Sequence, residues 1–263
     1  MAAKAHSTAT LRLSVGDLRI AHPITVPSGP VPAAEVVPAL QGLVNAVVAA
    51  AEAGRAISCR KGCGACCRQL VPVSRTEAER LADMVEGLPP ARRTALQARF
   101  DAAATTIRAA GLHERNGRPD RELSTAYFAL GIPCPFLEEE SCSIHPERPL
   151  VCREYLVTSP PELCAGPAQE GVTPVPVPKV SMAARGLQDE AGAAAGAPAA
   201  AAPGMASAGG APSAAGHAPA GDADWFPLAL LGEWAKTRPR KPERRPGPEW
   251  INRFLKGLAA RRT

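Results

Sequence analysis

Four cysteines within nine residues constrain this 263-residue chain more than any other feature of its sequence. They stand in the run CRKGCGACC, from Cys59 to Cys67. The remaining four of the eight cysteines lie far downstream, at Cys134, Cys142, Cys152 and Cys164. Because thiolates are soft ligands that suit zinc and iron–sulfur clusters, this pattern predicts a metal centre.

The spacing inside the first group suits a short loop that wraps around a metal. Its first three cysteines follow C-x3-C-x2-C spacing, which can place three sulfurs around one centre. Gly62 and Gly64 permit the tight chain path that this requires. Side chains of adjacent residues diverge, so we expect Cys66 and Cys67 not to bind the same single ion. A polynuclear cluster or two neighbouring sites would use both.

The downstream group lies in a proline-rich loop, and prolines lower the cost of ordering such a loop around a metal. Nearby cations are expected to offset the negative charge of the thiolates and to lower their pKa values. Arg153, which adjoins Cys152, is the strongest candidate. The full set of expected cations is Arg60, Lys61, Arg68, Arg148 and Arg153.

The two groups together resemble the YkgJ-type cysteine-cluster family of zinc- or iron-chelating domains. The resemblance rests on C-x3-C-x2-C-C followed by C-P-F-L…C-x-I-H-x-x-R-P-x-x-C-R-x-Y, and it covers about residues 55–158. It implies metal binding through seven cysteines: Cys59, Cys63, Cys66, Cys67, Cys134, Cys142 and Cys152. It leaves open whether the cofactor is Zn²⁺ or iron, including an iron–sulfur cluster, and it implies no settled reaction.

Three neighbouring residues have open roles. Cys164 lies outside the motif and is either a further ligand or a free thiol. His145 either completes a Cys3His site or caps a local turn. Tyr155 is expected to be a packing residue rather than a catalytic acid.

Three functions fit these observations. The first is a metal-binding module of unassigned downstream role. The second is a cluster-dependent, protein-modifying enzyme, because the flagellin lysine methylase is similar in its cysteine motif, although not outside it. The third is a factor that binds nucleic acid or an acidic partner through a basic tail. Radical S-adenosylmethionine enzymes share the C-x3-C-x2-C spacing, but this chain lacks their long alternation of strands and helices. Whether the protein is an enzyme, and on what substrate, stays open.

Hydrophobic periodicity predicts a mainly α fold with irregular, metal-stabilised loops and a small N-terminal β-hairpin. Alternating apolar residues over 11–28, interrupted by a Gly-Asp turn, predict the hairpin. Helical spacing predicts a helix over 32–53. A helical hairpin is expected over 74–111, where the capping box Ser74-x-x-Glu77 begins the first helix. Residues 127–130 are expected to form a short strand or turn.

Composition divides the chain into four parts: an N-terminal unit 1–54, a cysteine-cluster domain 55–165 that contains the helical insert, a Pro/Ala/Gly-rich disordered linker 166–221 and an aromatic, basic helical tail 222–263. The tail is predicted to form helices over about 225–236 and 247–261. From Lys236 onward ten Lys/Arg face two Glu, a net charge of +8, which leaves −3 for the rest. Trp250 and Phe254 therefore either dock on an acidic partner or nucleic acid, or pack back on the body.

No basic segment followed by an apolar run marks a secretory signal. The most apolar stretch, Ala39 to Gly54, contains polar residues and is judged too short to span a bilayer. We therefore expect a cytoplasmic protein without a membrane partner. In that reducing compartment, clustered cysteines are expected to bind metal rather than to form disulfides.

Overall fold

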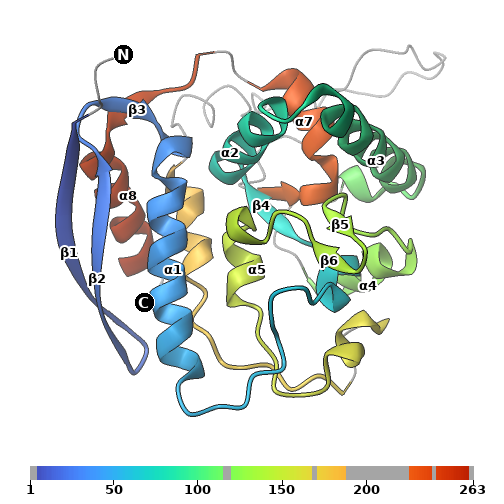
Figure 1. Ribbon diagram of the computed structural model, residues 1–263, viewed down its shortest axis with the longest axis horizontal. Coiled ribbons are helices and arrows are strands. Elements are labelled where there is room, and N and C mark those ends of the chain that lie inside the picture. Colours follow the sequence, from blue (N-terminus) through green and yellow to red (C-terminus); the bar gives the residue numbers. More distant parts are fainter. Residues whose placement is uncertain (1–4, 115–119, 168–170, 188–224, 239–240, 261–263) are drawn as a thin grey trace, which may run out of the picture.

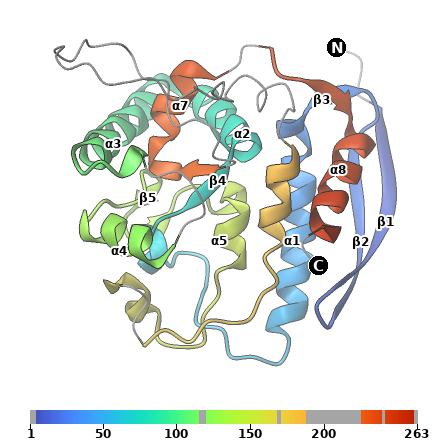
Figure 2. The same ribbon diagram turned by 180° about the vertical axis from the view of Figure 1, so that it is seen from behind.

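The computed structural model describes residues 5–114, 120–167, 171–187, 225–238 and 241–260, and these are mainly helical (Figures 1 and 2). The helices are α1 (Val37–Glu52), α2 (Arg75–Glu86), α3 (Pro90–Ala109), α4 (Arg121–Ala129), α5 (Leu150–Glu154), α7 (Leu231–Thr237) and α8 (Gly247–Ala259). The strands pair antiparallel as β1 (His6–Val15) with β2 (Leu18–Pro27), β3 (Pro30–Pro32) with β8 (Arg244–Pro246), β4 (Pro72–Ser74) with β7 (Trp225–Pro227), and β5 (Leu137–Glu138) with β6 (Ser141–Cys142). The predicted mainly α fold with a small N-terminal strand pair is confirmed.

The predicted N-terminal hairpin is the β1–β2 ladder, which lies along one edge of the molecule (Figure 1). The register runs up to Val15 opposite Leu18, so Gly16 and Asp17 form the turn as expected. The inward-facing residues of β2 are buried against α1, because a two-stranded ladder has no stable core of its own. The hairpin therefore depends on the helix that follows it.

A first apolar core, which we call the α1 core, forms where α1, α8 and the hairpin pack together. Helix α1 begins with Pro38 in its first turn and ends just before Gly54, as the sequence predicts. The apolar side chains of α1 that are buried in this core are Leu40, Leu43, Val44, Val47, Val48 and Ala51. Trp250 and Phe254 of α8 are fully buried against them, with no exposed surface.

Residues 171–187 also belong to the α1 core, which corrects part of the predicted linker over 166–221. Val180–Leu187 form a 3-10 helix that packs on α8, and Val180, Ala183 and Leu187 are buried there. The prediction failed here because Pro/Ala/Gly content does not distinguish a loose linker from small side chains that pack closely. Residues 188–221 of the predicted linker lie outside the described residues.

A second apolar core lies between α2, α3 and α7, and it contains the predicted helical hairpin over 74–111. Phe100 of α3 meets Phe136 edge to face, with ring centroids 5.4 Å apart. Leu231 of α7 is buried in the same cluster. Since Phe136 lies in the downstream cysteine loop, this core attaches that loop to the helices.

The C-terminal segments complete both cores, so they are not a separate tail. The two predicted helices are present as α7 and α8, but α7 lies with α2 and α3 while α8 lies beside the hairpin (Figures 1 and 2). β7 and β8 pair with strands from the first third of the chain. The indole Nε1 of Trp250 donates a hydrogen bond to the Val31 carbonyl oxygen at 2.8 Å.

This burial argues against stacking of the C-terminal aromatics on nucleic acid, because Trp250 and Phe254 have no exposed face. Several cations of the segment are also engaged within the protein. Arg238 pairs with Asp83 at 2.6 Å and with Glu86 at 2.9 Å.

Helix α4 was missed, because residues 127–130 were expected to form a strand or turn. Its first turn is capped by Asp120, whose Oδ1 accepts a hydrogen bond from the Leu123 amide at 2.7 Å. Only Leu123 and Tyr127 are buried, so the apolar pattern is too short to reveal a helical period.

The helical run Ala33–Glu52 is long and apolar enough to cross a bilayer by length and composition, which corrects the expectation that this stretch is too short. More than half of it is buried inside the protein, as befits the central helix of the α1 core. Length and composition alone are weak evidence for a membrane span.

Candidate metal centre

The first cysteine group lies on a loop that ends in a single 3-10 turn. Gly62 has φ 91°, a backbone conformation that only glycine adopts without strain. The 3-10 turn Ala65–Arg68 then carries Cys66 and Cys67, and the Cys67 amide donates a hydrogen bond to the Gly64 carbonyl at 2.9 Å. The tight path that the sequence predicts is therefore present.

Gly64 is the point at which the two cysteine groups meet. A Cβ atom there would lie 2.3 Å from the Glu140 carbonyl oxygen and 2.6 Å from Leu137 Cδ1. Both of these residues belong to the β5–β6 hairpin, which carries Cys142. Only glycine allows this approach, because the nearest atom belongs to backbone and cannot rotate away.

Polar contacts hold the two groups together at the same junction. The Cys134 amide donates to the Cys67 carbonyl at 2.6 Å. The guanidinium of Arg68 forms a two-pronged ion pair with the Glu140 carboxylate, at 2.7 and 2.9 Å. Glu140 has a positive φ of 57°, so this ion pair holds a hairpin tip in a conformation that side-chain-bearing residues rarely adopt.

A buried glutamate positions the short helix that carries Cys152. Glu77 and Ser74 form the predicted capping box at the start of α2. The second carboxylate oxygen of Glu77 accepts a hydrogen bond from the Leu150 amide of α5 at 2.8 Å. Burial raises the pKa of Glu77, and these hydrogen bonds oppose the rise. The capping box thus links α2 to the Cys152 helix.

Arg153 orders the chain beside Cys152. Its guanidinium donates hydrogen bonds to the carbonyl oxygens of Pro146 and Arg148 and to Asn45 Oδ1. It is buried, and burial lowers its pKa. Burial raises the pKa of Cys142, and the charges of Arg148 and Arg153 oppose this rise, so Arg153 both shapes the loop before α5 and places a positive charge near the thiols.

Arg148 is a second cation beside the thiols. It lines the pocket described below, and its Nη1 lies 2.5 Å from Nε2 of His145. Burial and the adjacent Arg148 charge lower the pKa of His145, so the neutral ring accepts this hydrogen bond. Since Nε2 is engaged by Arg148, the structure favours a local packing role for His145 over a ligand role through that atom.

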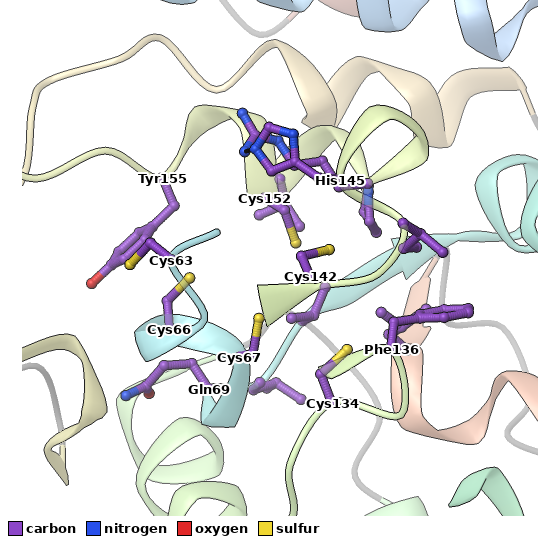
Figure 3. Close-up of a pocket in the computed structure, with 17 residues that line it drawn as sticks. Cys63, Cys66, Cys67, Gln69, Cys134, Phe136, Cys142, His145, Cys152 and Tyr155 are labelled. Carbon is purple, nitrogen blue, oxygen red and sulfur yellow. Dashed lines mark hydrogen bonds between the residues drawn. The ribbon is translucent and has the colours of Figure 1, made fainter. Parts of the chain in front are cut away.

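Six of the seven predicted ligands surround one pocket of about 120 Å³, which we call the cysteine pocket (Figure 3). They are Cys63, Cys66, Cys67, Cys134, Cys142 and Cys152. Phe136, Tyr155 and Gln69 also line it, and neither Phe136 nor Gln69 was singled out from the sequence. No sequence pattern marks Gln69, because its side chain donates hydrogen bonds to the carbonyl oxygens of Cys164 and Gly166, which lie almost a hundred residues away along the chain.

Cys59 and Cys164 lie next to this pocket without lining it. The Cys59 thiol faces the Tyr155 carbonyl oxygen at 4.0 Å, and the Tyr155 hydroxyl donates to Cys164 Sγ at 3.9 Å. Cys164 is buried, with 3% of its surface exposed. All eight cysteines are free thiols.

Burial raises the pKa of several of these thiols. The pKa of Cys134 rises to about 12, and that of Cys152 lies well above its ordinary value. The pKa of Cys66 is raised first by contact with the Cys67 thiol and then by burial. At neutral pH these groups are protonated thiols, so a metal that binds them displaces protons.

The donor set fits a thiophilic metal. Zn²⁺ takes four thiolates at about 2.3 Å, and iron–sulfur clusters take thiolates as well. In the described part of the chain, no three His, Cys, Asp or Glu side chains are already arranged to hold an ion. The thiols line the wall of one small space, so binding requires that they turn inward from that wall.

Fold and site together define a cysteine-rich domain whose donors suit a soft metal. Residues 58–169 match the model of the CxxCxxCC family, described as a "putative zinc- or iron-chelating domain". The match covers both cysteine groups and includes Cys164, and it confirms the family resemblance seen in the sequence. No curated protein and no solved structure matched the chain.

Proposed function

We propose that the protein binds zinc or iron through Cys59, Cys63, Cys66, Cys67, Cys134, Cys142 and Cys152. The observation that carries this proposal is that the two cysteine groups, separated by the whole α2–α3 hairpin, meet at one pocket. The family match over 58–169 supports the same chemistry. The reducing cytoplasm, where thiols stay free, is the compartment that this chemistry suits.

The metal would also order the loops around the pocket. These loops consist mainly of 3-10 turns and two-residue strands, and the apolar side chains that they bury are few, such as Phe136 and Ile144. A structural zinc contributes roughly 10–16 kcal/mol of apparent binding free energy. A whole domain is stable by only about 5–15 kcal/mol. Metal binding is therefore large enough to decide whether this part of the chain is ordered.

Anaerobic purification followed by elemental analysis and a visible absorption spectrum tests the proposal. Colourless protein with bound zinc supports a structural metal module. Brown protein with iron and sulfide supports a cluster. Metal-free protein that stays folded, with unchanged thermal stability after zinc or iron is added, contradicts the proposal.

A cluster-dependent enzyme is a second candidate, because the seven proposed ligands exceed the four donors that one tetrahedral ion takes. Six of these thiols line the same pocket, so a polynuclear cluster could use more of them than a single zinc ion.

Ligand exchange tests this second candidate. If the protein binds iron, the paramagnetic resonance spectrum of the reduced protein is expected to shift when cyanide is added. A spectrum that cyanide leaves unchanged contradicts the enzyme and leaves the metal-binding module. A protein that binds only zinc, which is redox-inactive, has the same consequence.

A further inference from the structure

The edge of the cysteine pocket carries positive charge from the first cysteine loop. Arg60 and Lys61 stand between Cys59 and Cys63, and both cations are exposed. The Cys63 amide donates a hydrogen bond to the Arg60 carbonyl oxygen at 3.1 Å, which closes a four-residue turn. Gly62, the third residue of this turn, has the positive φ that a type II turn requires. The turn therefore fixes two exposed cations next to Cys63, which lines the pocket.

A third cation lies in the wall of the pocket. Arg148 lines the pocket, and its Nη1 donates a hydrogen bond to Nε2 of His145. Its Nε is buried and has no hydrogen-bond partner among the described residues. A buried donor on a charged group is costly to leave unpaired, and a guanidinium offers only donors. Arg148 is therefore suited to bind an anion at this wall.

Carboxylates of the described residues do not offset this charge inside the pocket. The residues that line it, among those the structure describes, include no Asp or Glu. On the β5–β6 hairpin, the Glu140 carboxylate is already paired with Arg68. The charge of Lys61 also reaches the pocket wall, because burial and the charges of Arg148, Arg153 and Lys61 together lower the pKa of His145. The entrance is thus positive.

A positive entrance favours one form of the incoming metal over another. Zn²⁺ and Fe²⁺ as bare ions are cations, so this entrance repels them. A metal held by several carboxylates forms an anionic complex, which the same entrance attracts. A cleft lined by charge of one sign raises the association rate of an oppositely charged ligand by about 10- to 1,000-fold. The planar guanidinium of an arginine also matches a carboxylate in shape.

We propose that the cysteine pocket takes its metal from a small, anionic carboxylate complex by direct ligand exchange. Arg60 and Lys61 attract the complex, and Arg148 binds a carboxylate of the carrier while the thiols replace it on the metal. This inference rests on the proposed metal-binding function and adds to it the chemical form in which the metal arrives. The pocket of about 120 Å³ is smaller than the roughly 300–1,000 Å³ of pockets for drug-sized ligands, so only a small carrier group enters it.

The exchange balances without a redox step. Each thiol that binds the metal loses its proton and forms a metal–sulfur bond, while one metal–oxygen bond of the carrier breaks. The freed carboxylate or water accepts the proton, and the metal keeps its oxidation state. Arg148 holds the freed carboxylate until the carrier leaves, which keeps the carrier close during the successive replacements.

Zinc transfer to the reduced, full-length apoprotein, followed by stopped flow, tests the proposal. The zinc complex of nitrilotriacetate is the anionic probe, and the zinc complex of diethylenetriamine, a neutral triamine, is the cationic one. Arg60→Gln combined with Lys61→Gln should slow transfer from nitrilotriacetate about three- to ten-fold at low ionic strength. Transfer from diethylenetriamine should not slow, and the zinc bound per chain at equilibrium should match the wild type.

A control variant removes the same charge elsewhere. Arg12→Gln combined with Arg19→Gln alters two exposed positions of the β1–β2 hairpin, which lies along one edge of the molecule (Figure 1). This variant should transfer zinc at the wild-type rate. High salt should bring the wild-type rate with nitrilotriacetate close to that of the Arg60/Lys61 variant, because salt screens exposed charges.

Arg148 is tested by the dependence of the rate on the concentration of the nitrilotriacetate complex. The wild-type rate should saturate, because the complex binds before ligands exchange. Arg148→Gln should raise the concentration for half-maximal rate about ten-fold, since a hydrogen bond to a charged group is lost. Arg148→Lys keeps the charge without the planar fork and should recover part of this loss. It also replaces Arg148→Gln in the test if that variant does not fold by circular dichroism.

The outcomes distinguish this inference from the proposed function. A transfer rate that equals the release of zinc from the carrier, at every protein concentration, means that the free ion is taken up. That result overturns the inference while metal binding stands. Equal slowing with both zinc complexes, or by both double variants, also overturns it. A wild-type protein that takes zinc from neither complex, nor from a zinc salt, contradicts the proposed function itself.

Discussion

The α1 core and the cysteine pocket are ordered by different physical means. In the α1 core, long helices and a hairpin bury apolar side chains such as Leu40, Val44 and Phe254 completely. Around the cysteine pocket, short turns meet through single hydrogen bonds, one glycine contact and an arginine clamp. Burial of apolar surface stabilises in proportion to area, and around the cysteine pocket it comes from a few side chains such as Phe136 and Leu150. We therefore expect metal removal to affect the order of the cysteine pocket, and loss of a buried apolar side chain to affect the stability of the α1 core.

Metal removal is expected to have the largest effect, and it should affect the loops around the cysteine pocket but not the α1 core. A chelator should open the loops around the pocket, because a thiolate-bound zinc contributes on the order of 10 kcal/mol. Amide hydrogen exchange should rise in residues 59–68 and 134–152 and change little in α1. An equal rise in both regions would show that the α1 core also depends on the metal.

Trp250→Ala should act on the α1 core alone. Trp250 is fully buried and hydrogen-bonded to the Val31 carbonyl. Truncation of such a side chain costs about 3–5 kcal/mol of unfolding free energy. Urea denaturation measures the loss, and Trp234→Ala, at a partly exposed position in the second core, is the control that should cost less. The folded variant should bind as many metal ions per chain as the wild type. A lower number would show that metal binding depends on the α1 core.

Glu154→Gln should remove a pH dependence of the unfolding free energy. Glu154 lies where α5, which carries Cys152, meets the segment Val180–Leu187 of the α1 core. Glu154 on α5 accepts hydrogen bonds from the amide and hydroxyl of Ser181, both at 2.6 Å. Burial raises its pKa from 4.5 to about 7, so between these values the folded state holds a proton that the unfolded state releases. The unfolding free energy therefore falls as pH rises from about 4.5 to about 7, by up to about 3 kcal/mol.

Urea midpoints measured across that range should fall less in Glu154→Gln than in the wild type. Glu162→Gln, at an exposed position, is the matched control and should follow the wild-type curve. A wild-type curve without this slope would show that Glu154 titrates near its ordinary value.

Gly64→Ala should separate the two cysteine groups. The new methyl would overlap the Glu140 backbone, and overpacking of this kind costs roughly 1–3 kcal/mol. Zinc affinity, measured by competition with a chromophoric chelator, should fall because the β5–β6 hairpin is displaced. Gly29→Ala is the control, since a Cβ there meets no atom within 4 Å. Equal zinc affinities in the Gly64→Ala and Gly29→Ala variants would show that the close approach at Gly64 is not needed to hold the two cysteine groups together.

Arg68→Ala should have the smallest effect. The Arg68–Glu140 ion pair is exposed on the Glu140 side, where solvent screens it. The thermal midpoint should barely change at high salt, and at low salt it should fall slightly. A large loss at high salt would mean that the ion pair is needed to hold the strained hairpin tip.

Much of the fold could be predicted from the sequence. For the site, the sequence predicted which residues take part but not how they are arranged in space. The hairpin, α1, α2 and α3 follow from alternation, helical spacing and a capping box over long enough stretches. Helix α4 was missed because two buried positions set no period. The sequence named Arg153 as a cation near the thiols, but it gave no sign that the same guanidinium also holds the carbonyl oxygens of Pro146 and Arg148.

The chemical class of the donors and the local elements follow from the sequence, because thiol content and short-range periodicity can be read along the chain. Which distant segments meet follows from the three-dimensional packing. It placed Gly64 against Glu140 and Cys164 against Tyr155, and it returned α7 and α8 to two different cores. Such pairings depend on long-range packing, in which small side chains and backbone groups leave no local pattern to detect.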